Sequence, residues 1–403
     1  MKVLFVNAYF APENIAFSHL EEDLIRGILE KGHTIEVLCP VPTRGISRET
    51  AKAYQDRKKE TMFDGKVTVT RFWAPQEGRN PLIRAFRYVW CNLRQYQLGK
   101  KQKDIDAIFA VSTPPTQGWL AGKLAKKLGC PFLYSLQDIF PDSLVTTGLS
   151  KKDSLLWKIG RKLEDSTYQS ADQIVVISKA MQQNILAKGV PPEKIRLISN
   201  WVDTEAVQPV EKADNKLFEE FDIQRGKFTV VYAGNFGASQ GAGVVLEAAK
   251  RLPAVQFAIF GGGAEFEAAK EEAEKLPNVI INGLLPQSRV PEVYSLGDAA
   301  VITCKKGVGK AGLPSKTWSI MACNTPIVAA FDTDSPLAQI LEESGSGICV
   351  EPENAEALAK AITEMKENSE AYSGGRDYVN QNASRTLCVE QYVTTLEALV
   401  HQK

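Results

Sequence analysis

Residues 304–322 read CKKGVGKAGLPSKTWSIMA, a glycine-rich and basic segment that becomes helical toward its end. Glycines let backbone N–H groups approach a ligand closely, and the start of a helix favours an anion. Pro314 suits a first helical turn, and Ser315 offers a hydroxyl to a ligand or to the helix cap. The segment therefore predicts a phosphate or diphosphate site near Ser315. A solvated lysine loop is the alternative, and these residues alone do not decide between the two.

The composition of the whole chain limits the classes of function. A length of 403 residues suggests two or three domains, and the formal net charge of zero gives no nucleic-acid signature. With three histidines, seven scattered cysteines and no CxxC pair, neither a disulfide framework nor a metal site is expected. The start of the chain does not resemble a signal peptide, and no apolar run approaches the ~20 residues of a membrane span. We expect a cytoplasmic protein with no nucleic-acid partner.

The first half has the pattern of a doubly wound parallel sheet. An unbroken apolar run at Lys2–Val6 predicts a buried strand, and a helix at 19–30 and a second strand at 34–38 follow it. Ligands of such sheets lie beyond the carboxyl ends of the strands. The loop that contains Asn14 and Ser18 is therefore a candidate site wall. Asp138 follows another predicted strand, and we expect it to serve the ligand, with capping of the next helix as the alternative.

Residues 79–103 are unusual, because they combine many arginines and lysines with interleaved aromatic and aliphatic residues and contain no acid. A basic helix with an apolar face can lie in a membrane interface beside anionic lipid. A core helix with a solvated basic side is the other interpretation. Both stay open at this level.

The second half starts a second series of strands after a mixed, charged linker at 205–227. A predicted strand at 228–232 leads into a glycine loop whose spacing does not match G-x-G-x-x-G, which argues against a nicotinamide or flavin cofactor. Its N–H groups could still cradle phosphates. We expect two doubly wound α/β domains facing a cleft, 1–205 and 206–384, with a C-terminal helix at 385–403 that packs back on the first.

The chain resembles glycosyltransferase family 4, the retaining GT-B enzymes, over nearly its whole length. It is similar in particular to members that assemble bacterial O-antigen, capsule and colanic-acid-type polysaccharides. The resemblance is carried by short motifs that are weak singly and specific together: FAPEN at 10–14, GHTIEVL at 32–38, QDIFPD at 137–142, ISNWVD at 198–203, YAGN at 232–235, the glycine run 261–263, PNVIING at 277–283 and LPSKTWSIMA at 313–322.

The resemblance implies a metal-independent transferase, without a cofactor, that uses a nucleoside-diphosphate sugar. The expected donor site lies on the second domain, with Lys316 and Asp138 as catalytic residues. The donor-binding residues that it implies are Gly237, Gln240, Gly262, Leu285, Lys310, Leu313, Pro314, Ser315, Lys316 and Ser319. The chain departs from the family at two places. Ala311 and Ser319 stand where the family usually has a pair of glutamates, and Asn235 and Gln240 stand where many members have an Arg or Lys pair. How the ribose is bound is therefore not given by the resemblance.

The expected reaction moves a sugar, such as an N-acetylamino sugar from a UDP-sugar, to a polyprenyl-diphosphate-linked saccharide. Asn14 and Ser18 are expected near this acceptor in the first domain. Segment 79–103 would then bring the enzyme to the cytoplasmic face of the plasma membrane as a peripheral protein. The alternatives are a nucleotide-sugar-binding subunit without catalysis, suggested by Ala311 and Ser319, and a sugar-nucleotide 2-epimerase.

Overall fold

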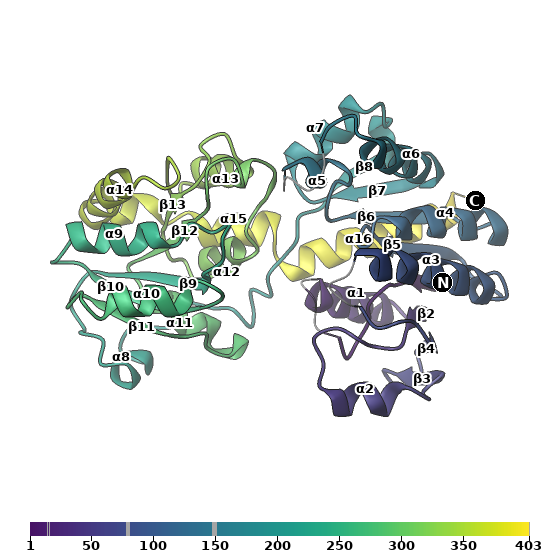
Figure 1. The fold of residues 1–403 in the computed structure, drawn as a ribbon, viewed down its shortest axis with the longest axis horizontal. Coiled ribbons are helices and arrows are strands. Elements are labelled where there is room, and N and C mark those ends of the chain that lie inside the picture. The colour runs from purple at the N-terminus through teal and green to yellow at the C-terminus, as the bar shows by residue number, and fades with distance from the viewer. Residues whose placement is uncertain (14, 16, 78–80, 147–150, 403) are drawn as a thin grey trace. The chain divides into compact units, whose positions relative to one another are not determined.

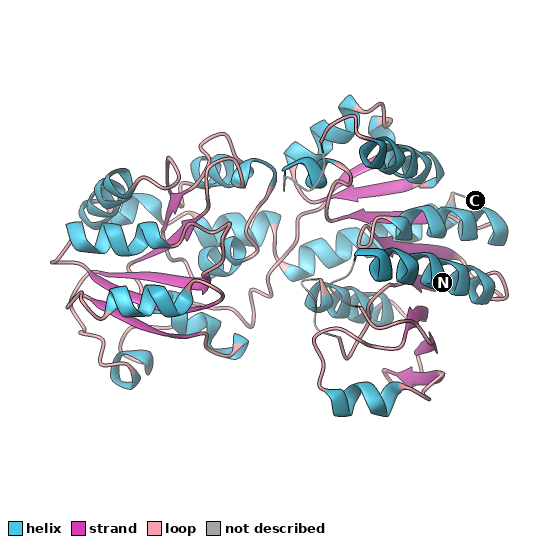
Figure 2. Cartoon of the chain, in the orientation of Figure 1, coloured by secondary structure: helices cyan, strands magenta, loops and turns pink. Residues whose placement is uncertain are grey.

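The computed structural model describes residues 1–13, 15, 17–77, 81–146 and 151–402. The chain forms two compact units, each an α/β unit built on its own sheet (Figures 1 and 2). Unit 1 consists of Met1–Ser199 and Cys388–Lys403, and unit 2 consists of Asn200–Leu387. The predicted α/β class, with two mainly parallel sheets, is confirmed.

Unit 1 alternates strands and helices from its first residues. Its elements are β1 (Lys2–Val6), α1 (Ser18–Glu30), β2 (Thr34–Pro40), α2 (Arg48–Tyr54), β3 (Lys59–Met62), β4 (Val67–Phe72), α3 (Pro81–Gly99), β5 (Ala107–Val111), α4 (Thr116–Leu128), β6 (Phe132–Leu136), α5 (Asp142–Thr146), α6 (Leu155–Ser170), β7 (Gln173–Val176), α7 (Lys179–Ala187), a 3-10 turn (Pro192–Lys194) and β8 (Ile195–Leu197).

The unit 1 sheet has eight strands in the order β3-β4-β2-β1-β5-β6-β7-β8, parallel except at the β3–β4 pair. Val3–Val6 and Ala107–Ala110 are fully buried in neighbouring central strands, because helices cover both faces of the sheet. The sequence pattern missed β3. Lys59–Met62 is a polar edge strand with no buried residue, so it carries no apolar run.

The helix α16 (Arg385–His401) contributes its residues from Cys388 onward to unit 1. Tyr392 is buried against the sheet, and its hydroxyl lies 2.9 Å from Ser135 Oγ. His33 Nε2 lies 2.7 Å from Glu397 Oε1, which gives this histidine a structural partner. A Cβ at Gly27 on α1 would stand 2.1 Å from Val389 Cγ1, so α16 packs directly on the backbone of α1.

Unit 2 repeats the alternation with a smaller sheet. Its elements are α8 (Leu217–Glu220), β9 (Thr229–Asn235), α9 (Gly243–Arg251), β10 (Gln256–Gly262), α10 (Phe266–Ala273), β11 (Val279–Gly283), a 3-10 turn (Gln287–Arg289), α11 (Val290–Leu296), β12 (Ala299–Thr303), a 3-10 turn (Gly309–Ala311), α12 (Lys316–Ala322), β13 (Ile327–Ala330), α13 (Pro336–Ser344), β14 (Gly347–Val350), α14 (Ala355–Glu367), a 3-10 turn (Ser369–Tyr372) and α15 (Gly375–Asn382).

The unit 2 sheet is parallel throughout, in the order β11-β10-β9-β12-β13-β14. Successive residues of its strands enter two separate cores. Val231 and Phe260 pack with α11 to α13, whereas Val230 and Phe257 pack with α9 and α14. All six strands therefore end at one edge of the sheet, where the loops of the glycine-rich segment gather.

No helix among the described residues is long and apolar enough to cross a bilayer.

Candidate functional site

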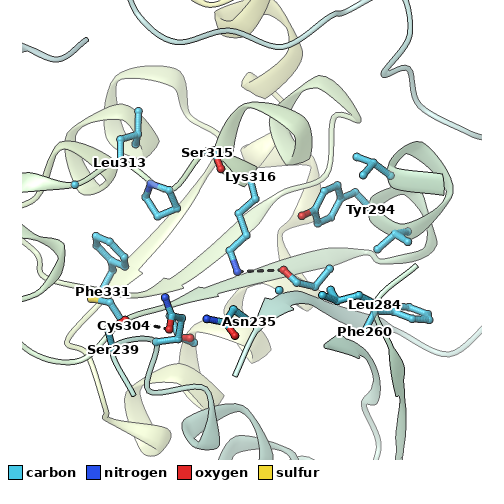
Figure 3. A pocket seen from close by; sticks show the side chains of 18 of the residues that line it. Asn235, Ser239, Phe260, Leu284, Tyr294, Cys304, Leu313, Ser315, Lys316 and Phe331 are labelled. Atoms are coloured by element: carbon cyan, nitrogen blue, oxygen red, sulfur yellow. Dashed lines mark hydrogen bonds between the residues drawn. The ribbon is translucent and has the colours of Figure 1, made fainter. Parts of the chain in front are cut away.

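A pocket of about 560 Å³ lies at the carboxyl edge of the unit 2 sheet (Figure 3). Its volume is in the range of small-molecule and cofactor sites. The lining comes from the ends of β9, β10, β12 and β13, from the start of α11 and from the segment that leads into α12. The lining residues are Ala233, Gly234, Asn235, Ser239, Gln240, Phe260, Leu284, Leu285, Pro286, Val290, Val293, Tyr294, Thr303, Cys304, Val308, Gly312, Leu313, Pro314, Ser315, Lys316 and Phe331.

Lys316, the first residue of α12, is the cation of this pocket. Figure 3 shows its side chain reaching down toward β9, where Nζ donates a hydrogen bond of 3.2 Å to the carbonyl oxygen of Ala233. The same Nζ lies 4.5 Å from the centre of the Tyr232 ring. No carboxylate of the described residues forms an ion pair with it. Burial lowers the pKa of Lys316 from 10.5 to about 8.

This environment is costly for a charged group, because desolvation disfavours the ammonium and only a carbonyl and a ring offset the loss. Gly234 shows how close the backbone comes: its φ is +155°, and a Cβ there would stand 3.0 Å from Lys316 Nζ. A buried cation with a lowered pKa in a pocket is a common feature of functional sites. The arrangement favours an anionic ligand that supplies the missing counter-charge.

The two sides of the pocket differ in chemistry. Asn235, the last residue of β9, forms a polar side with Ser239 and Gln240, and Ser239 Oγ donates to Gln240 Oε1 at 3.0 Å. Leu284 and Leu285, just after β11, form an apolar side together with Phe260 of β10 and with Val290 and Val293 of α11. A ligand with one polar, anionic part and one flat, apolar part suits this division.

The structure brings six of the predicted donor residues together in the pocket lining: Gln240, Leu285, Leu313, Pro314, Ser315 and Lys316. Four others are not part of the lining: Gly237, Gly262, Lys310 and Ser319. Gly237 lies behind the polar side, since a Cβ there would stand 2.8 Å from Asn235 Nδ2. Gly262 ends β10, where a Cβ would contact Leu284 at 3.4 Å.

The structure corrects the expected role of the glycine loop. The N–H groups of Gly307 and Gly309 donate to the buried carboxylate of Asp332, each at 2.8 Å. They therefore hold the loop together instead of facing a ligand. Lys310 also points elsewhere, because its Nζ pairs with exposed Asp334 at 2.8 Å.

The helix start differs from the expectation as well. The helix begins at Lys316, so Pro314 precedes it instead of occupying its first turn, and the Ser315 side chain makes no capping hydrogen bond. The Ser315 hydroxyl is therefore not engaged as a cap. The α12 helix has only seven residues, and the charge of Lys316, not a long helix dipole, is the main electrostatic feature of the pocket.

The predicted residues of unit 1 lie at the carboxyl edge of its own sheet. Asp138 is exposed just after β6, and its N–H donates to Ser112 Oγ at 3.1 Å. Ser18 starts α1, where its hydroxyl donates to Glu13 O at 3.1 Å and accepts from Ile15 N at 2.9 Å. Ser18 thus shapes the loop before α1. Asn14 and Arg79 lie outside the described residues, as does the side chain of Ala311.

Two buried acids near this edge were missed by the sequence analysis. Glu13 Oε1 accepts from the N–H groups of Thr43 and Arg44 at 2.7 and 2.9 Å, which joins two loops. Glu21 accepts a hydrogen bond from Asn7 Nδ2, and burial raises the pKa of Glu21 to about 8. Glu21 could have been noticed, because it falls beside Leu20 and Leu24 on the apolar face of α1. Among the described residues, no three His, Cys, Asp or Glu side chains gather as metal ligands would.

Comparison with known proteins agrees with this architecture. Residues 22–201 match the family model for a glycosyl transferase 4-like domain, and residues 213–385 match the model for glycosyl transferases group 1. The chain is 30% identical over 339 residues to WbjE of Pseudomonas aeruginosa, which is named as a glycosyltransferase, with 82% of this chain and 84% of WbjE covered.

A second relative is WcaI of Escherichia coli (strain K12), whose name assigns it to colanic acid biosynthesis as a glycosyl transferase. It is 26% identical over 413 residues, which covers 98% of this chain and all of WcaI. The crystal structure of Anabaena Alr3699/HepE in complex with UDP superposes with a TM-score of 0.70 at 17% identity, over 99% of this chain and all of HepE. That likeness concerns the fold. The two family matches and the extent of the identity to WbjE lead to one conclusion: the chain belongs to the glycosyltransferases that join a 4-like domain to a group 1 domain, and it has their GT-B fold.

Proposed function

We propose that this glycosyltransferase moves a sugar from a nucleoside-diphosphate sugar to a polyprenyl-diphosphate-linked saccharide, with retention of configuration, in the synthesis of a bacterial surface polysaccharide. The observation that carries the proposal is Lys316, a buried ammonium without a carboxylate partner among the described residues, in a pocket of unit 2. A diphosphate supplies the counter-charge that this position lacks. The name of WcaI and the UDP bound to HepE support a polysaccharide role and a UDP-sugar donor.

We place the diphosphate at Lys316, with the Ser315 hydroxyl and Gln240 as further donors of hydrogen bonds, and the base against Leu284 and Leu285. With a pKa of about 8, Lys316 is mostly protonated at neutral pH before the ligand arrives. The ligand's negative charge then stabilises the ammonium further. A cation supplied by the protein itself fits a reaction without a metal ion.

Lys316 then acts on the transition state. As the bond between the anomeric carbon and the phosphate oxygen breaks, negative charge grows on that oxygen and the sugar becomes oxocarbenium-like. A preorganised ammonium in a site of low polarity stabilises this charge more than it stabilises the ground state. The acceptor hydroxyl attacks the anomeric carbon from the face that the phosphate leaves, and its proton passes to the departing phosphate oxygen. This step gives retention of configuration.

Unit 1 presents the acceptor in this proposal. Asp138 is exposed at the carboxyl edge of the sheet, where it can orient an acceptor hydroxyl. Ser18 supports the same edge by fixing the loop before α1. Asn14, in that loop, remains part of the proposed acceptor site.

The helix α3 supports an acceptor that is held in a lipid bilayer. Its buried side carries polar groups: Arg87, which is 1% exposed, donates to the carbonyl of Pro75, and Gln95 donates to the carbonyls of Asn7 and Leu38. Its outward side carries Leu82, Phe86, Val89 and Leu93, spaced so that they form one stripe.

In the first half of α3 this orientation is the reverse of an ordinary surface helix, whereas Cys91 and Leu98 of the second half pack on unit 1. A core helix with a solvated basic side would expose Arg87 and bury the apolar stripe, whereas here Arg87 is buried and the stripe is exposed. We propose that the stripe contacts the inner face of the plasma membrane, where the enzyme is peripheral and its lipid-linked acceptor is held.

The test is a panel of UDP-, GDP- and ADP-sugars, N-acetylamino sugars included, screened by thermal shift, followed by incubation of the stabilising donor with a lipid-linked acceptor. A selective shift and a new glycoside with the anomeric configuration of the donor are expected. A shift with no glycoside, for any acceptor offered, would favour the non-catalytic binding subunit. An epimerised sugar nucleotide would favour the epimerase, and the absence of any shift would contradict the diphosphate site.

A further inference from the structure

We propose that the first half of α6, together with the residues just before it (Lys151–Lys162), is a second membrane-binding segment that recognises anionic headgroups. This inference extends the proposed function, because it concerns how the enzyme reaches a lipid-linked acceptor. It rests on a surface of unit 1 that takes no part in the donor pocket. The occupant is a bilayer with negative surface charge.

Exposed apolar side chains are concentrated on two helices. Of the twelve large hydrophobic side chains that are exposed among the described residues, eight lie on α3 and α6. On α6 they are Leu155, Leu156 and Ile159, which are 76%, 52% and 57% exposed. The opposite side of α6 buries Gly160, Glu164, Thr167 and Tyr168 against unit 1. Like α3, α6 thus directs a polar group inward and an apolar cluster outward.

The charges around the α6 cluster are mainly positive, because segment 151–162 has one acid, the exposed Asp153, beside Lys151, Lys152, Lys158, Arg161 and Lys162. Lys158 and Lys162 are exposed one turn from Leu155 and Ile159, and neither pairs with a carboxylate of the described residues. The acids of this helix are engaged elsewhere, because Glu164 and Asp165 both pair with Arg161. Lysines that flank apolar side chains on one face match a bilayer interface, where the apolar groups enter below the headgroups and the ammonium groups meet lipid phosphates.

The two helices extend in the same direction from the sheet. Both pack beside α4 (Figure 1). Asn92 of α3 contacts Thr116, the first residue of α4, and Thr167 of α6 lies against Gly118. Each therefore starts about ten residues, or about 15 Å, before α4 does. The exposed apolar residues of both helices lie mainly on these projecting halves.

The cations that can meet anionic lipid lie on α6, not on the projecting half of α3. On the projecting half of α3, Arg87 is buried and Arg84 lies 3.6 Å from Glu77, whereas Lys100 and Lys101 lie at the far end. The α3 stripe therefore supplies apolar area, and the α6 lysines supply attraction to anionic lipid. A second copy of the chain would fit this surface less well, because a two-fold contact would place lysine clusters of the same sign together.

The experiment is cosedimentation of the full chain with vesicles of phosphatidylcholine alone and with vesicles in which part of this lipid is replaced by phosphatidylglycerol. We expect binding to the anionic vesicles only. The variant Lys158→Gln/Lys162→Gln should lower the partition coefficient roughly 30-fold, since each lysine near a charged surface contributes about fivefold. The matched control, Lys126→Gln/Lys127→Gln, removes the same charge from the exposed last turn of α4 and should bind like the wild type.

A second variant, Leu155→Ser/Ile159→Ser, should weaken binding to the same vesicles without lowering the Tm, because both side chains are already in water. Equal binding by wild type and Lys158→Gln/Lys162→Gln would overturn the inference, as would an equal loss in the α4 control. Self-association abolished by Leu155→Ser/Ile159→Ser would assign the surface to a second copy instead. Donor binding measured on the same proteins reports the proposed function separately, since vesicle binding requires neither donor nor transfer.

Discussion

Replacement of Lys316 by methionine should weaken nucleotide binding and, at the same time, stabilise unit 2. Methionine keeps the length of the side chain and removes the charge. The lowering of the lysine pKa from 10.5 to about 8 corresponds to about 3 kcal/mol at neutral pH. The Ala233 carbonyl and the Tyr232 ring surround Nζ in the folded protein and offset part of this cost. A buried charge with little compensation is replaced by a well-packed apolar group.

The sign of the pH dependence follows from the direction of the shift. Between pH 8 and 10.5, the unfolded chain holds a proton on Lys316 that the folded protein has released, so the stability of the wild type rises with pH across this window. The advantage of Lys316→Met should therefore be full below pH 8 and should disappear as the pH approaches 10.5. Its magnitude below pH 8 corresponds to an increase in Tm of roughly 6–12 °C for a unit of this size.

The assay combines calorimetric unfolding with titration of UDP. In the wild type, we expect UDP to raise the temperature of the unfolding transition of unit 2. In Lys316→Met we expect this transition at a higher temperature at pH 7 and an affinity for UDP about 10- to 100-fold lower, the value of a charge-assisted hydrogen bond. The variant Lys310→Met offers the comparison, because Lys310 is exposed and outside the lining, so both changes should be much smaller. An unchanged affinity for UDP in Lys316→Met would refute the placement of the diphosphate, and an unchanged Tm would refute the burial argument.

Three further predictions concern the scaffold. Between pH 4.5 and 8 the folded protein keeps a proton on Glu21 that the unfolded chain releases. The free energy of unfolding of unit 1, measured with urea, should therefore fall by up to about 5 kcal/mol across this window. The variant Glu21→Gln should show a smaller fall. In Asp332→Asn, the N–H of Gly307 or Gly309 faces an amide N–H₂ group and loses its acceptor. The free energy of unfolding should fall by about 1–3 kcal/mol, and titration should show a lower affinity for UDP. The control Asp334→Asn should leave the loop intact. Gly27→Ala should destabilise unit 1 by about 1–3 kcal/mol in the same unfolding assay, and Val389→Ala should restore most of the loss if the contact with α16 is as close as described.

Much of the fold follows from the sequence, because buried parallel strands leave an unbroken apolar run in it. Lys2–Val6 is such a strand, and the structure gives it the predicted bounds. β3 leaves no such signal, because an edge strand that packs on one side can remain polar.

The burial of polar side chains on α3 could not be predicted from the sequence. Arg87 and Gln95 are buried because carbonyls of Pro75, Asn7 and Leu38 accept their hydrogen bonds, and those partners are distant in the chain.

The candidate site divides in the same way. The segment 313–316 could be predicted as part of a pocket wall, since its composition and its place after a strand suggest one. The difference between Lys310 and Lys316 could not be predicted, because both are lysines in one basic segment and only the packing sends one to Asp334 and the other into the pocket. The hydrogen bonds that hold the glycine loop could not be predicted either. Their acceptor, Asp332, lies outside the basic segment, just after the next strand.

The most direct test of the account is a crystal structure of the protein with the nucleoside diphosphate that the donor panel selects. We predict that the diphosphate lies in the unit 2 pocket with an oxygen within hydrogen-bond distance of Lys316 Nζ, and with the base against Leu284 and Leu285. A nucleotide bound elsewhere, or bound in this pocket with Lys316 Nζ still directed only at Ala233, would contradict the central claim that this buried lysine recognises the donor.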